Sequence, residues 1–377
     1  MNKKVFSISI NGKIGLNLHD LNNEKTEGNQ LTTRYVTIVD GNGNLATVNA
    51  VSGDMLKHIQ AGHLYNIARE ANNLPLCQGC QKFDANRITI DEEFDKFTAN
   101  NDKSEIVDKL LEMCVMDDLE GVLITNNNQN IGRDSVVEFG WLVAIQDEFY
   151  SENLFHVKYS NNTYFNLCLD ALKGEGIEIS DDFRQRLSEV FAEKPTGEDL
   201  KNIVNELSEE FKLSASRKKM IESYLQEQNS NTKNLGQNIF YRPVNSGQYA
   251  VVNNLEIARI GYNDIAKTYS IDKDSIKNRY KALLKSIMLT YYSPEGAMRN
   301  TQSPHLTSFM GVVSISYTSV PAPTVSALNP QYREEIMSIT ETLKKLGEDV
   351  ELREFNSMAE FCGIINDLIQ DTVPYGA

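Results

Sequence analysis

The sequence predicts an α+β fold, with a sheet that is covered by helices mainly on one face and interrupted by long insertions. Several short segments alternate between apolar and polar residues, as half-buried strands do. Other segments repeat apolar residues every three or four positions, as amphipathic helices do. The strand-like segments are separated by helices and lie far apart in the chain. A ferredoxin-like core fits this order best, because packed layers of this class join strands that are distant in sequence.

The first predicted elements are a strand and a β-hairpin. Residues 4–10 alternate like a half-buried strand, and a polar loop is expected after them. Residues 33–40 and 44–49 are expected to pair as a hairpin. The turn Gly41-Asn-Gly43 joins them, because Asn and Gly supply the positive φ angles that tight turns need.

A helix is expected over residues 53–72, where Leu56, Ile59, His63 and Ile67 form one stripe. The segment after it is expected to be an irregular insertion. Further helices are expected over residues 103–118, 181–192, 196–212, 214–227, 272–288, 329–346 and 357–367. Further strands are expected over residues 121–124, 135–145, 237–244, 249–260 and 312–317.

The composition indicates a globular protein without a membrane span. The chain has 377 residues, of which 41% are hydrophobic, enough for one elaborate domain or two. The apolar run Phe139–Ile145 is far shorter than a membrane span, and the N-terminus lacks the apolar core of a signal peptide. Five cysteines, an odd number without a secretory signal, suit a reducing compartment. A cytoplasmic protein is therefore expected.

The net charge of −15 is concentrated in two segments. Residues 91–120 hold eleven Asp and Glu against three Lys, and residues 170–227 hold fourteen against nine Lys and Arg. By subtraction these segments carry −13 of the −15. The rest of the chain is nearly neutral, and a nucleic-acid surface needs only a local positive potential. The acidic composition therefore does not exclude RNA or DNA as a partner.

The segment Val51-Ser-Gly-Asp-Met-Leu-Lys-His58 has the pattern of a phosphate site at a helix start. Unpaired backbone N–H groups and the positive end of the helix dipole attract an anion there. Gly53 lets the backbone come close, and Lys57 adds a charge one turn into the helix. The alternative is that Ser52 only caps the helix, which is the commoner role of Ser at this position.

A second candidate site is a zinc site at His63, Cys77, Cys80 and Cys114. The pair Cys77-x-x-Cys80 has the spacing of zinc ligands, and the other two residues would complete a site of three Cys and one His. The alternative remains open that His63 and Cys114 are core residues, because each continues the apolar stripe of its helix. A structural zinc ion is therefore a hypothesis for the insertion at residues 73–102.

An ordered set of short motifs resembles the DevR-type backbone subunit of type I CRISPR interference complexes. The motifs follow the order of that family from residue 15 to about residue 330. They are Asn17–Asn22, Thr33-Arg34, Val51–His58, Leu76–Cys80, Cys114–Gly121, Arg133–Ser135, Gly247–Ala250, Pro294–Ala297 and Pro304-His305. Residues 180–228 and the helices after residue 330 match nothing in the family pattern.

The resemblance implies a modified RRM-like palm with finger insertions and a thumb hairpin that folds over RNA. The palm would comprise residues 1–72, which include the thumb, 103–179 and 229–330. Residues 73–102 would be an insertion, for which metal binding stays a hypothesis. Apart from the resemblance, residues 180–228 are expected to form a helical subdomain and residues 331–377 C-terminal helices.

The resemblance also implies a role for each candidate residue. Lys57, His58, Arg34 and Arg133 would contact crRNA phosphates, which positions RNA without reading its sequence. Arg299 and His305 lie on a loop that would touch the RNA or a neighbouring subunit. The complete predicted RNA-binding set is Asn17, Arg34, Ser52, Gly53, Lys57, His58, Arg133, Arg299 and His305.

The expected partners follow from the same resemblance. They are crRNA, the target DNA strand paired to the guide, other Cascade subunits, and further copies of the chain arranged head to tail. No membrane partner is expected.

The sequence favours binding over catalysis. It contains no Walker loop, no nucleophile elbow and no His-Glu-x-x-His motif. Related type III backbone subunits cut RNA with a loop aspartate, for which Asp40 and Asp54 are conceivable positions, but no motif specifies either. We therefore expect a protein that is not an enzyme.

The alternative function is a DNA-binding transcriptional regulator. Residues 262–280 have the pattern of a helix-turn-helix with a basic second helix, in which Lys277 and Arg279 would reach the major groove. The predicted first helix is short, however, and the strand-like segment before it leaves no partner helix for a three-helix core.

Overall fold

The computed structural model describes residues 3–27, 30–40, 43–158, 180–190, 196–216 and 238–377, with short pieces at 169, 173, 218–219 and 221–223. The chain forms two compact units, each discontinuous in sequence. The larger unit comprises residues 1–25, 32–152 and 243–377, and the smaller unit comprises residues 26–31 and 153–242. Among the described helices, none has a stretch long and apolar enough to cross a membrane.

The main sheet has the strand order β15-β14-β2-β11-β10-β6-β5. The strands are β2 (Ser7–His19), β5 (Tyr35–Val39), β6 (Leu45–Val51), β10 (Leu142–Lys158), β11 (Asn238–Leu255), β14 (His305–Ser316) and β15 (Val350–Phe355). β2 is antiparallel to both of its neighbours, β11 and β14. β5 and β6 form the predicted hairpin, which is therefore confirmed.

Shorter strands surround this sheet. β9 (Val137–Phe139) pairs with β11, and β1 (Lys3–Val5) pairs with β16 (Thr372–Pro374) near the two ends of the described chain. Three further pairs are β3 (Asn23–Glu27) with β4 (Gln30–Thr33), β7 (Val122–Ile124) with β8 (Ile131–Arg133), and β12 (Tyr262–Asn263) with β13 (Thr268–Tyr269).

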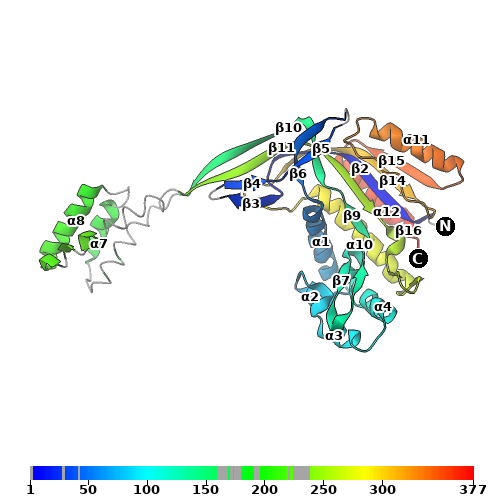
Figure 1. Cartoon of the computed structure of the whole chain (residues 1–377), viewed down its shortest axis with the longest axis horizontal. Coiled ribbons are helices and arrows are strands. Elements are labelled where there is room, and N and C mark those ends of the chain that lie inside the picture. Colours follow the sequence, from blue (N-terminus) through cyan, green and yellow to red (C-terminus); the bar gives the residue numbers. More distant parts are fainter. Residues whose placement is uncertain are drawn as a thin grey trace. The chain divides into compact units, whose positions relative to one another are not determined.

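Helices of the larger unit pack on both faces of the sheet. Val312 and Val313 are neighbours on β14, so their side chains point to opposite faces. Val313 joins the main core under α1 (Gly53–Glu70), α10 (Lys273–Tyr292) and α12 (Met358–Asp371), whereas Val312 packs with α11 (Tyr332–Lys345). The long helices α1 and α10 lie side by side (Figure 1). The mixed α and β class predicted from the sequence is confirmed, but helices cover both faces.

The insertion after α1 is more regular than the sequence suggested. It contains α2 (Gln78–Gln81), the 3-10 turn η1 (Arg87–Ile90) and α3 (Glu92–Thr98). Asp91 caps α3 by accepting hydrogen bonds from the backbone N–H groups of Glu93 and Phe94, and Phe94 is fully buried. This cap and its buried anchor explain why a polar, acidic segment is helical.

The helix expected over residues 103–118 is two helices. α4 (Lys103–Met113) and α5 (Val115–Glu120) meet at Cys114, whose extended backbone angles interrupt the helical path. This break redirects the chain, and every residue of α5 is buried. Four acidic side chains of the segment 91–120 are therefore inside the protein and not on its surface: Asp91, Asp117, Asp118 and Glu120.

Several other expectations require correction. The polar loop expected after residue 10 is wrong, because β2 continues to His19 with buried polar side chains. The two strands expected between residues 237 and 260 are one strand, β11, followed by the turn η4 (Ile257–Arg259). The strand expected over residues 135–145 is divided between β9 and β10. The sequence did not predict β15 or β16.

The helix-turn-helix is also not formed. The residues expected to form its first helix form the hairpin β12–β13 instead. The following helix, α10, starts at Lys273 with Asp272 as its N-cap. Arg279 is buried, and Lys277 pairs with Asp274 on the same helix. A DNA-reading helix would need both cations at the surface. The structure therefore removes the basis of the regulator hypothesis.

In the smaller unit, two of the predicted helices are described, α7 (Asp181–Val190) and α8 (Gly197–Glu210). Thr196 and Asp199 form a capping box at the start of α8, in which each side chain bonds the backbone of the other residue. α8 buries one apolar stripe, made of Leu200, Ile203, Val204 and Leu207. The described residues between 215 and 223 are helical.

Candidate nucleic-acid interface and metal centre

The start of α1 is fixed by Ser52 and Gly53. The hydroxyl of Ser52 accepts a hydrogen bond from the backbone N–H of Met55 at 3.2 Å and donates one to Asn22 Oδ1 at 3.0 Å. A Cβ atom on Gly53 would lie 2.5 Å from the carbonyl oxygen of Phe139, so only glycine fits against β9. Both residues are buried. They position the helix start and do not form an exposed contact surface, which differs from the direct RNA contact expected for them.

A cavity of about 320 Å³ opens beside this helix. Lys57 and His58 line it from α1, and Phe83 and Arg87 line it from the insertion. Lys57 makes no hydrogen bond or ion pair with another described residue. The remaining lining residues are Asp54, Ala61, Cys80, Asp84, Ala85 and Met116. The structure thus gathers two of the predicted RNA-binding residues with an aromatic ring and a second cation that the sequence analysis did not select.

The charge on Lys57 is adjusted by its surroundings. Partial burial lowers the pKa of the Lys57 amine, and nearby Glu120 opposes that shift. Burial raises the pKa of Glu120 to about 7, although Lys57 and Arg87 both favour the ionised carboxylate. Neither oxygen of the Glu120 carboxyl group has a hydrogen-bond partner among the described residues. The wall of the cavity therefore contains cations that are not neutralised by a direct contact with this carboxyl group.

Arg34 is held at the base of the hairpin. Its guanidinium carbon lies 4.7 Å from the centre of the Trp141 ring, a cation–π distance. Its backbone carbonyl accepts a hydrogen bond from Asn49, which in turn accepts one from Tyr249. The Tyr249 hydroxyl lies 2.9 Å from Nε2 of His19, a buried imidazole whose pKa is lowered to about 4 by burial. A chain of hydrogen bonds across the sheet thus fixes the backbone of Arg34, which lies directly before β5.

Asn17 and His305 lie opposite each other on β2 and β14. His305 is exposed and Asn17 is half-buried. The structure therefore joins two predicted RNA-binding residues that are far apart in the sequence. Arg299 is also exposed, but it forms an ion pair with Glu295 in its own segment, which reduces its local positive charge.

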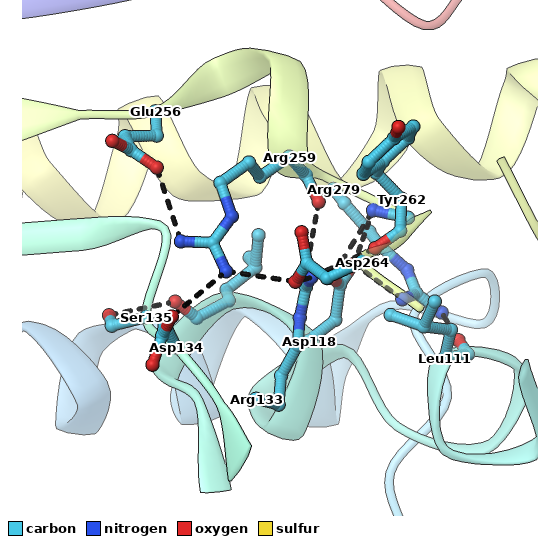
Figure 2. Close-up of polar contacts among 12 residues, drawn as sticks. Leu111, Asp118, Arg133, Asp134, Ser135, Glu256, Arg259, Tyr262, Asp264 and Arg279 are labelled. Carbon is cyan, nitrogen blue, oxygen red and sulfur yellow. Dashed lines mark hydrogen bonds and ion pairs between the residues drawn. The ribbon is translucent and has the colours of Figure 1, made fainter. Parts of the chain in front are cut away.

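Arg133 requires a correction, because its side chain is only 1% exposed. Its guanidinium donates to Asp118 at 2.7 Å and to Asp264 at 2.7 Å. Asp118 also pairs with buried Arg279 at 2.7 Å and accepts hydrogen bonds from the backbone N–H of Gly261 (Figure 2). Arg133 thus holds α5 to the turn after β11 and is not available to a phosphate.

The cysteine pair lies in a buried cluster that fits a metal ion. Cys77, Cys80, Cys114 and Asp117 each offer one ligand atom, and these atoms lie within 4.8 Å of one another. Tetrahedral zinc with Zn–S bonds of about 2.3 Å places sulfur atoms roughly 3.8 Å apart, so small side-chain shifts suffice. Burial raises the pKa of Asp117, and its Oδ1 has no hydrogen-bond partner among the described residues. The thiols of Cys77 and Cys80 donate to the other oxygen of this carboxylate, Oδ2. A carboxylate and three thiols suit Zn²⁺.

The metal ligand set predicted from the sequence changes at one position. His63 is not part of the cluster, because its Nε2 lies 2.9 Å from the carbonyl oxygen of Ser293 where α1 packs on α10. Asp117 takes the fourth position. A signal for it was present, since Cys114 and Asp117 repeat the two-residue spacing of Cys77 and Cys80.

Residues 10–166 and 217–336 match the family described as "CRISPR-associated negative auto-regulator DevR/Csa2". This match spans more than half of the chain. The chain belongs to the DevR/Csa2 family. The resemblance drawn from short motifs is thereby confirmed, and the protein is CRISPR-associated. No curated protein sequence matches the chain.

Solved structures similar to this DevR/Csa2 member carry CRISPR titles. A chain of a "CRISPR RNA-guided surveillance complex" is 9% identical with a TM-score of 0.43, and the alignment covers 97% of this chain and 98% of that one. Csc2 from Thermofilum pendens is 11% identical with a TM-score of 0.34, and the alignment covers 97% of this chain and 86% of that one.

The DevR/Csa2 match places the candidate sites inside the family region. The first matched segment contains the hairpin, α1 and the metal cluster, and the second contains α10 and β14. Helices α7 and α8 lie between the two segments, and α12 follows them. The cavity and the metal cluster therefore belong to the part of the chain that defines the family.

Proposed function

We propose that this DevR/Csa2 protein binds crRNA as a non-catalytic backbone subunit of a CRISPR interference complex. The observation that carries the proposal is the cavity beside α1, in which Lys57, His58 and Arg87 meet the ring of Phe83. Proteins that bind single-stranded nucleic acid without sequence preference combine cations for the backbone with aromatic rings for the bases. The family match supplies the CRISPR context.

The order of the central elements supports an RRM-like palm. The strands lie in the order β14-β2-β11-β10, with α1 between β2 and β10 in the chain and α10 between β11 and β14. This is the arrangement of a ferredoxin-like β-α-β-β-α-β unit. The hairpin β5–β6 is the proposed thumb, because it exposes Tyr35, Val39 and Leu45. These apolar side chains suit a contact with RNA bases or with a neighbouring copy.

The proposal assigns the protein a binding role rather than RNA cleavage. Asp40, one of the two aspartates considered for catalysis, accepts a hydrogen bond from the backbone N–H of Asn44 and so stabilises the hairpin turn. Asp54 lies in the first turn of α1, where a carboxylate complements the helix dipole. Each aspartate has a structural role that accounts for its position.

The partners follow from this function. The protein would bind crRNA, contact the target DNA strand that pairs with the guide, and assemble with other Cascade subunits in the cytoplasm. Copies that coat RNA must repeat head to tail, and such heterologous contacts generate an open filament rather than a closed dimer.

We also propose a structural Zn²⁺ ion held by Cys77, Cys80, Cys114 and Asp117. The support is the buried donor set and the Oδ1 of Asp117, which has no hydrogen-bond partner among the described residues. Bound there, the ion would tie α2, inside the insertion, to α5, which follows the insertion.

Charge reversal tests the proposed RNA surface. The double variant Lys57→Glu with Arg34→Glu is expected to weaken binding to all single-stranded RNA sequences alike. The logarithm of the affinity should also depend less steeply on the logarithm of the salt concentration, by roughly 0.7 for each lost phosphate contact. Fluorescence anisotropy at several salt concentrations measures both effects.

The matched control for this test is the double variant Lys344→Glu with Lys345→Glu. It makes the same change in net charge on exposed residues of α11. The control should bind RNA as the wild type does. Full affinity of the Lys57 and Arg34 variant at physiological salt would show that the proposed binding surface is wrong.

A further inference from the structure

We propose that the cavity beside α1 receives one unstacked nucleobase of the bound RNA, with the ring of Phe83 as the stacking surface. The inference rests on the proposed function and adds to it a specific subsite in which a base, and not only a phosphate, is bound. It depends on the lining of the cavity, on the support of the Phe83 ring and on the balance of charge around it.

The lining suits a flat, largely apolar group with a polar edge. The volume of about 320 Å³ lies at the lower end of small-molecule pockets, which start at about 300 Å³. Ala61, Ala85 and Met116 provide apolar surface. Phe83 is 37% exposed, so part of its ring is accessible from the solvent.

Neighbouring side chains support the Phe83 ring. Its centre lies 5.1 Å from that of Tyr65 and 5.8 Å from that of His58, both on α1. The Tyr65 hydroxyl donates to the carbonyl of Gln81, which ties α1 to the end of α2, two residues before Phe83. Phe83 also has a positive φ of 53°, a costly conformation for a bulky residue. The ring is thus held beside the cavity by a strained backbone conformation.

The charges around the cavity favour a neutral occupant. Lys57 and Arg87 contribute positive charge, and Asp54 and Asp84 contribute negative charge. Asp84 accepts hydrogen bonds from the backbone and side chain of Asn86, and Arg87 donates to the carbonyl of Gly121 at 2.6 Å. A bare phosphate or a metal cation would face both signs of charge at once. A nucleobase is neutral and carries donors and acceptors on its edge, while its phosphates remain available to the cations.

The insertion sets the position of the subsite. Phe83 follows Cys80 by three residues, and its backbone N–H donates to the carbonyl of Cys80. A Cβ atom on Gly79 would lie 1.9 Å from the carbonyl oxygen of Arg87, so the two sides of this loop touch. The metal cluster and the proposed base site therefore share one loop.

The test compares RNA with a base-free ribose phosphate polymer of the same length. Wild-type protein is expected to bind the RNA more tightly. Phe83→Leu should weaken RNA binding by roughly 5- to 150-fold, the range found when a stacking ring is removed, and leave the affinity for the base-free polymer unchanged. Phe83→Tyr retains the ring and should bind RNA as the wild type does.

The outcomes distinguish this inference from the proposed function. If Phe83→Leu binds RNA as the wild type does while Lys57→Glu binds it weakly, the base subsite is wrong and the RNA-binding surface stands. If the wild-type protein binds neither polymer, the proposed function itself is wrong. Circular dichroism and a thermal melt of Phe83→Leu check that the variant is folded, so that the binding of two folded proteins is compared.

Discussion

Replacing Asp118 by asparagine is expected to lower the free energy of unfolding by about 3–5 kcal/mol, the usual cost of removing one partner from a buried ion pair. Asp118 is fully buried and forms ion pairs with both Arg133 and Arg279, whose side chains are 1% and 2% exposed. The Nε atoms of both arginines already lack hydrogen-bond partners among the described residues. Without the carboxylate, two buried positive charges would lose their shared counter-charge.

Urea denaturation followed by circular dichroism measures this loss. Asp134→Asn is the matched control, because Asp134 contacts Arg259 from an exposed position, with 86% of its side chain accessible. Exposed ion pairs contribute about 0–1 kcal/mol, so the control should be nearly as stable as the wild type. Equal stability of the two variants would contradict the structural role assigned to the Asp118 network.

Zinc removal is expected to have the second large effect. Protein purified without chelator should contain one zinc ion per chain, and the double variant Cys77→Ser with Cys80→Ser should contain nearly none. Structural zinc sites contribute on the order of 10 kcal/mol or more to local folding. Chelation should therefore remove hydrogen-exchange protection from the insertion and α5 before the main sheet unfolds. Metal analysis and hydrogen-exchange mass spectrometry measure the two effects.

Three single variants identify the ligands. Asp117→Ala should weaken zinc binding, whereas His63→Asn should keep it, because His63 contacts Ser293 and not the cluster. Cys362→Ser is the control thiol, since Cys362 lies half-buried on α12 outside the cluster. A zinc content near zero in the wild-type protein would leave the cysteines as core residues.

The sequence was sufficient where structure is set by neighbouring residues. The hairpin depends on its turn residues, and the start of α1 depends on its Ser52 cap, so both were predicted within a few residues. β2 was not recognised beyond residue 10, because its polar residues resemble a loop. In the structure Asn11 is buried between Ser9 and Thr324, and only the second partner comes from a distant part of the chain.

The candidate sites also depend on contacts between residues that are distant in the sequence. Arg133 appeared to be a surface cation because its burial depends on Asp118 and Asp264, which are brought to it only by the fold. Likewise, a stripe on α1 cannot reveal that His63 faces α10 and that Asp117 faces the cysteines. Phe83 was overlooked because it belongs to no periodic pattern of apolar residues in the sequence. Its significance follows from the side chains that surround it.

Sedimentation with RNAs of increasing length tests whether the protein is a backbone subunit that coats RNA. A backbone subunit is expected to add to RNA in steps, one copy for each fixed increase in RNA length, and to form open assemblies that carry RNA of defined length. The Lys57→Glu and Arg34→Glu variant should fail to load on the same RNAs. Stepwise growth of the wild-type complex is expected of a backbone subunit. A closed two-fold dimer of unchanged size, with or without RNA, would contradict it.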